Sequence, residues 1–123
     1  MVQEYARGGQ IEEIAQDSTL GGYIAKHGRP PAFEASDGSH YSVDLYVTEG
    51  TDGEDLKFRF GGALLFVRWS EDGTQPIGHL ETCYLVQSDD RVDVRSRLHA
   101  LSLYEVKEHL DRLVDEHQSL PDW

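Results

Sequence analysis

The side chains best suited to chemistry in this chain lie on two stretches that read as neighbouring β-strands. Arg68 stands near the end of the first stretch, and His79, Glu81 and Cys83 alternate along the second. Histidine transfers protons near neutral pH, carboxylates act as bases or ligands, and arginine binds anions. If these four side chains share one sheet face, they could bind a small anion or take part in acid–base chemistry.

The two strands are joined by a turn around Asp72-Gly73. An Asp-Gly pair between alternating residues predicts a tight hairpin, because both residues tolerate a positive φ. With this pair as the loop, Val67 lies opposite Gly78. That register gives the buried face an almost wholly apolar set: Ala63, Leu65, Val67, Trp69, Leu80, Thr82, Tyr84 and Val86. It leaves the other, polar face to Leu64, Phe66, Arg68, His79, Glu81 and Cys83.

Two further strands extend this polar face. Residues 41–48 alternate so that Val43 points to the core and Asp44 points away, and Arg59 has the same relation to Phe58. We therefore predict a candidate ligand-binding site composed of Asp44, Arg59, Arg68, His79 and Glu81. The simpler interpretation is a solvated sheet face with cross-strand ion pairs, which antiparallel sheets commonly have.

Metal, nucleophile and cofactor chemistry have less support. His79 and Glu81 could share an ion, but zinc needs three or four ligands and only Cys83 and Asp44 could complete the set. Cys83 as a nucleophile would need a nearby base, and four residues of strand put His79 about 13 Å away. The glycine pairs form no phosphate-binding loop. We assign no catalytic residue, no metal and no cofactor, and favour a non-catalytic protein over an enzyme.

The charge balance restricts the classes of molecule that we expect the protein to bind. The 123 residues include 23 acidic and 11 basic side chains, for a formal net charge of -12. Phosphate backbones and anionic membrane surfaces attract clustered Lys and Arg, so we expect neither nucleic acid nor membrane as a partner. The acidity has two interpretations. It could keep the protein soluble at high salt, in which case stability should rise with added salt, or it could dock a basic protein partner.

Composition also indicates a compartment. No apolar run approaches the roughly 20 residues that span a bilayer, and the N-terminus lacks the pattern of a secretory signal. A single cysteine cannot form an internal disulfide. We therefore expect a cytoplasmic protein.

The first half of the chain predicts short elements. Residues 1–9 should be loose, residues 10–16 could form a helix, and residues 19–27 a second helix that ends at Gly28. A short strand over 32–35 precedes the strand at 41–48. An acidic loop covers 49–55, and Gly61-Gly62 predicts a bulge, bend or break before the hairpin.

The second half ends in helices. Ser88-Asp89-Asp90 can cap a helix that reaches about Leu101. Ser102 and Glu105 have the spacing of a capping box for the last helix, after which residues 119–123 should fray. The order predicts one α+β domain over residues 1–123. It has an antiparallel sheet of four to five strands, short N-terminal helices, and two C-terminal helices packed on one sheet face.

We therefore interpret the chain as a small acidic protein-binding or regulatory module, whose partner has a basic surface. The alternative is a small-molecule or anion-binding domain, including an enzyme, that uses the polar sheet face. A homodimer through the sheet face or the last helix is a further hypothesis, with Phe66 and Trp69 as interface anchors.

Overall fold

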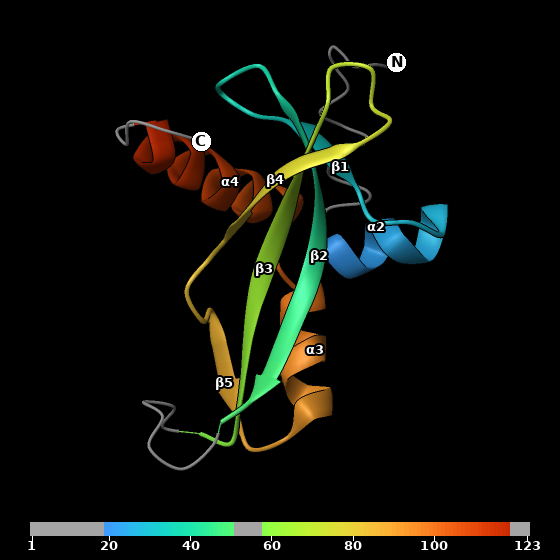
Figure 1. Cartoon of the computed structure of the whole chain (residues 1–123). Helices are drawn as coiled ribbons and strands as arrows, with labels where there is room; N and C mark the ends of the chain where they lie inside the picture. The colour runs from blue at the N-terminus through green and yellow to red at the C-terminus, as the bar shows by residue number, and fades with distance from the viewer. Residues whose placement is uncertain (1–18, 51–57, 119–123) are drawn as a thin grey trace.

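The computed structural model describes residues 19–50 and 58–118 (Figure 1). In this part of the chain an antiparallel sheet of five strands packs with three helices, two of which follow the last strand. The predicted α+β fold is confirmed. The helix expected over residues 10–16, most of the acidic loop and both loose ends lie outside the described residues.

Helices and strands occupy separate parts of the sequence. Helix α2 (Leu20–His27) comes first, the strands follow, and helices α3 (Arg91–His99) and α4 (Leu103–Gln118) come last. The strands are β1 (Ala32–Glu34), β2 (His40–Glu49), β3 (Phe60–Trp69), β4 (Pro76–Glu81) and β5 (Val86–Ser88). The sheet order is β1-β2-β3-β4, and β5 pairs with the start of β3 beyond the end of β4. Strand β3 therefore has β2 beside it along its whole length, and β5 and β4 beside its two ends on the other side.

The predicted helix boundaries are largely confirmed. Gly28 ends α2 with a φ of 71°, a conformation that favours glycine. At the start of α3 the Asp90 side chain accepts a hydrogen bond from the Val92 N–H at 3.0 Å. The capping box of α4 has both of its bonds, from Glu105 N–H to Ser102 Oγ at 3.0 Å and from Ser102 N–H to Glu105 Oε1 at 2.8 Å.

The break predicted at Gly61-Gly62 is wrong. Strand β3 continues through both glycines, and Gly62 pairs with Val47 of β2. A methyl group on Gly62 would lie 2.5 Å from Val94 Cγ1 and 2.8 Å from Leu98 Cδ1. The missing side chain thus lets α3 pack directly on the sheet, which is a packing role rather than a turn.

The predicted hairpin register holds at the turn and fails beyond it. Ser70 N–H donates to Gln75 O at 2.8 Å, and Trp69 pairs with Pro76 as a loop at Asp72-Gly73 implies. The next pair is Arg68 with Gly78, so Ile77 is an extra residue in β4. Such a bulge shifts every later pair by one residue and exchanges the two faces of one strand relative to the other.

As a result the buried face of β3 is the one predicted to be polar. Val67 pairs with His79 and Phe66 with Leu80, and both Phe66 and Leu64 are fully buried. Leu65, Val67 and Trp69 were expected in the core and are only half-buried on the opposite face, while Tyr84 is 41% exposed. Residues from the sheet and all three helices form the core cluster, which includes Leu20, Tyr41, Val43, Leu64, Phe66, Leu80, Val94, Leu98, Val106, Leu110 and Val114.

Candidate functional site

The sheet face turned away from this core is called the open face here. Two rows of residues cross its three longest strands in register: Asp44–Leu65–Glu81 and Ser42–Val67–His79. The next pairs along it are Tyr46 with Ala63 and His40 with Trp69. Helix α3 packs against the other side of the sheet, where Val94 and Leu98 meet Gly62.

An apolar stripe follows β3 along the open face. Leu65, Val67 and Trp69 are each half-buried, although they line the surface. The indole Nε1 of Trp69 donates a hydrogen bond to Ser42 Oγ at 2.9 Å, which ties the ring to β2. At one end of the stripe, Tyr46 is 43% exposed. This surface could not be predicted from the sequence, because β3 is apolar on both faces and the bulge that decides which face is buried has no sequence signature.

Carboxylates border the stripe. Asp44 on β2 and Glu81 on β4 lie on either side of Leu65, and Glu34 on β1 lies beside His40. Within the five described strands the one Lys or Arg side chain is Arg68, and its position in β3 puts it on the buried face. The open face therefore combines an apolar centre with a negative border.

Three of the five predicted site residues share this face. Asp44, His79 and Glu81 lie there, as expected. A shallow hollow of about 380 Å³ lies beside them, lined by Leu65, Val67, Pro76, Gly78, His79 and Glu81. Ligand binding by these three residues stays a prediction.

The two predicted arginines lie elsewhere. Arg68 Nε donates to Ser39 Oγ at 3.2 Å on the buried side of the sheet. Arg59 precedes β3 at the far end, where its Nε is 3.1 Å from Glu49 Oε2. The bulge at Ile77 explains why Arg68 does not share a sheet face with His79, because it shifts the pairing of β4 with β3 by one residue. The five side chains therefore do not converge on one point.

Cys83 leaves the strand pattern altogether. Strand β4 ends at Glu81, and Leu64 N–H then donates to the Thr82 side chain at 3.0 Å instead of to a backbone carbonyl. Thr82 Oγ1 also lies 2.7 Å from the carbonyl of Cys83. The Cys83 side chain is exposed. The alternation that grouped Cys83 with His79 thus stops before reaching it.

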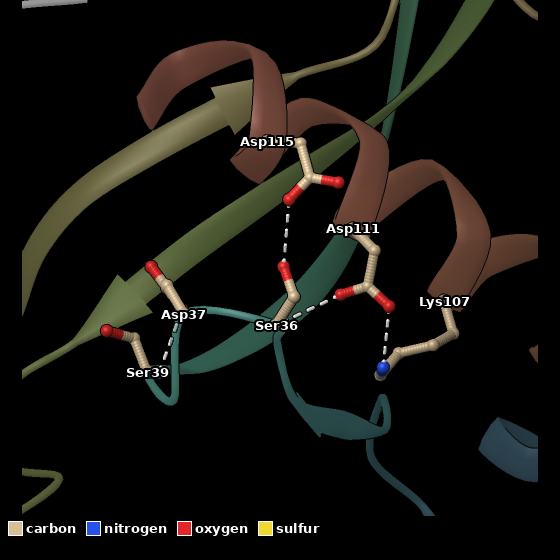
Figure 2. A network of polar contacts seen from close by, with 6 residues as sticks. All are labelled: Ser36, Asp37, Ser39, Lys107, Asp111 and Asp115. Carbon is tan, nitrogen blue, oxygen red and sulfur yellow. Dashed lines mark hydrogen bonds and ion pairs between the residues drawn. The ribbon is translucent and has the colours of Figure 1, made fainter. Parts of the chain in front are cut away.

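A second polar cluster joins the β1–β2 turn to α4 (Figure 2). Ser36 N–H donates to Asp111 Oδ1 at 3.0 Å, and Ser36 Oγ donates to Asp115 Oδ1 at 3.2 Å. Asp111 also accepts a hydrogen bond from Lys107 Nζ at 2.7 Å. In the sequence, Ser36-Asp37-Gly38-Ser39 has the composition of a turn, and Asp111 and Asp115 are four residues apart, but neither pattern shows that the two segments meet. The cluster holds the turn in place.

Tyr41 lies beneath that turn and is fully buried. Its hydroxyl donates to Asp37 Oδ2 at 3.3 Å. Burial, with the Asp37 charge as the next cause, raises the pKa of Tyr41 to about 12, although Arg68 opposes the shift. The phenol is therefore held in its neutral, donating form, which suits a structural hydrogen bond and not a nucleophile or base.

Over residues 19–50 and 58–118, no three His, Cys, Asp or Glu side chains come together as a metal site requires. None of the described helices combines the length and apolarity needed to cross a bilayer.

Comparison with protein-family models, with curated proteins and with solved structures finds no match to this chain. What the protein could bind is therefore inferred from its own residues, and from the open face in particular.

Proposed function

We propose that the protein is a non-catalytic binding module whose open face docks a protein partner with apolar and basic side chains. The observation that carries the proposal is the half-buried stripe of Leu65, Val67 and Trp69 between the carboxylates of Asp44 and Glu81. Exposed apolar surface rimmed by polar groups commonly marks a binding surface.

The stripe has the composition of an interface centre. Tryptophan and tyrosine are enriched among the residues that contribute most to protein–protein affinity. The hydrogen bond from Trp69 to Ser42 already restrains the indole, so less side-chain freedom is lost when a partner binds. Tyr46 extends the same surface along β2.

The carboxylates that border the stripe determine the sign of the charge that a partner should carry. A Lys or Arg side chain that reaches Asp44 or Glu81 would be attracted, and an acidic partner would be repelled. The formal net charge of -12 acts in the same direction at longer range and would speed the approach of a basic protein.

A defined probe tests both features. In a ¹⁵N NMR titration, a short peptide of alternating Lys and Val should shift the amides of Ser42, Leu65 and Val67, and a Glu and Val peptide should not. Glu81→Lys should weaken the Lys and Val peptide roughly tenfold, the loss typical of one close charge pair. Glu108→Lys is the matched control, because Glu108 is exposed on α4. Shifts scattered over the helices, or equal binding of both peptides, would refute the proposal.

The alternative is a small-ligand site in the hollow beside His79. Its volume of about 380 Å³ would admit a small molecule. An anion there would meet the Glu81 carboxylate, while Arg68 and Arg59 lie away from the hollow. We therefore place this alternative second, and titration with inorganic phosphate, followed by the His79 ring protons, tests it directly.

A further inference from the structure

Helix α3 is a basic, partly apolar surface on an otherwise acidic protein. It has three arginines and one aspartate. Arg97 is paired with Asp93 at 3.3 Å, whereas no ion pair of Arg95 is found within the described part of the chain. The Arg91 guanidinium lies 5.0 Å from the ring centre of Phe60, which restrains it beside the helix.

An exposed valine lies among these charges. Val92 is 72% exposed, the highest value among the large apolar side chains of the described residues. Val92 and Arg95 are three positions apart and Arg91 and Arg95 four, so the three are surface neighbours on one side of α3. The core contacts of this helix come instead from Val94 and Leu98, which are fully buried. Val92 is therefore not part of the core that the described residues form.

We propose that α3 of one copy binds the open face of a second copy. The inference rests on the proposed function, because it takes the open face as a docking surface and names its occupant. Val92 would lie on the stripe of Leu65 and Val67, and the flanking arginines would reach the carboxylates of Asp44 and Glu81. The apolar stripe of the open face would contact the exposed valine of α3, and the carboxylates around the stripe would contact the arginines of α3.

The spacings of the charged groups on the two surfaces differ by an amount that arginine side chains can cover. Arg91 and Arg95 are separated by about 6 Å along the helix axis. Asp44 and Glu81 lie two strand spacings apart across Leu65, roughly 9.6 Å. Arginine side chains are long and flexible enough to cover the difference while their stems stay on apolar surface.

The arrangement of the two surfaces determines the kind of assembly. Helix α3 packs against Gly62 on the core side of the sheet, so it lies on the opposite side from the open face. A pair of copies can therefore form one such contact and not two, which makes the contact head-to-tail. Rows or rings of copies follow, and the self-repulsion of charge -12 keeps each contact weak until salt screens it.

Complementary variants test the contact. Arg91→Glu with Arg95→Glu disables α3 and leaves the open face intact, whereas Val67→Lys with Glu81→Lys disables the open face and leaves α3 intact. In sedimentation velocity at about 0.15 M salt, where charges interact over about 8 Å, the unmodified chain should show a mass that rises with concentration. Each variant alone should stay monomeric, and an equimolar mixture should form a dimer and nothing larger.

Three controls make the result decisive. Circular dichroism establishes that each variant is folded, and Glu81→Lys alone replaces the double variant if that one does not fold. Arg112→Glu reverses an exposed charge on α4 and should leave association within twofold of the unmodified chain. A monomeric unmodified chain at about 1 mM, a free energy of association weaker than about 4 kcal/mol, overturns the inference. So does a mixture that does not associate.

The peptide titration separates this inference from the proposed function. If the Lys and Val peptide binds the open face but copies of the chain do not associate, the open face is a docking surface for another protein and only the self-association fails. If the peptide does not bind, the proposed function fails as well.

Discussion

The indole N–H of Trp69 donates a hydrogen bond to the hydroxyl of Ser42 across two strands of the open face. Trp69 ends β3 at the residue next to the bulge, so this bond also secures the point at which the register of the hairpin changes. The same contact serves the fold and the proposed docking surface.

Ser42→Ala should lower the free energy of unfolding by about 1 kcal/mol, because the Trp69 N–H loses its partner in a half-buried position. Urea denaturation followed by tryptophan fluorescence measures the change, and the native emission should also move as the ring becomes freer. Ser96→Ala on the exposed side of α3 is the control and should have little effect. Equal losses in the two variants would contradict the assignment.

Gly62→Ala should destabilise the fold by about 1–3 kcal/mol, since the new methyl group meets Val94 and Leu98 at 2.5 and 2.8 Å. Val94→Ala removes one of the obstructing groups and should cost stability by itself through the cavity it leaves. The double variant should lose less unfolding free energy than the two single variants lose together. A double-mutant cycle from denaturant unfolding provides the measurement, and strict additivity would mean that the two sites do not touch.

Tyr41 should make the fold sensitive to alkaline pH. Its pKa is raised from an ordinary value of 10.0 to about 12 in the folded protein, so folding favours the neutral phenol. This stabilisation is complete below pH 10 and is lost as the pH rises towards about 12. The measurement is the difference between the unmodified chain and Tyr41→Phe, which isolates the contribution of this one phenol.

The unfolding free energy of the unmodified chain should fall more steeply than that of Tyr41→Phe between pH 10 and 11.5. In Tyr41→Phe, absorbance at 295 nm should show one tyrosine fewer that ionises only towards pH 12. Parallel pH profiles for the two proteins would show that the buried phenol does not contribute.

Asp111→Ala should release the β1–β2 turn from α4. Asp111 accepts hydrogen bonds from the Ser36 N–H and from Lys107, so its loss should cost about 1–2 kcal/mol. Hydrogen exchange at the Ser36 amide should accelerate roughly tenfold or more. Asp115→Ala removes only the longer bond to the Ser36 hydroxyl and serves as the graded control. Faster exchange in the Asp115 variant than in the Asp111 variant would reverse the assigned order.

Local patterns predicted the elements well because each depends on neighbouring residues. The capping box at Ser102 and Glu105 and the stop at Gly28 both come from contacts within a few positions. The alternation of β2 also identified its buried side correctly, with Tyr41 and Val43 in the core.

The sheet register required information that neighbouring residues do not contain. Both sides of β3 are apolar, so burial could not choose between Leu64 with Phe66 and Leu65 with Val67. A single extra residue at Ile77 made the choice. The candidate site inherited that error, because Arg68 was grouped with His79 through the hairpin and not through β2.

The contact between Ser36 and Asp111 joins residues that are 75 positions apart. The β1–β2 turn can therefore reach its final state only after α4 has been made. During synthesis the strands leave the ribosome well before α4, so Phe66 and Val43 lack part of their core packing until that helix follows.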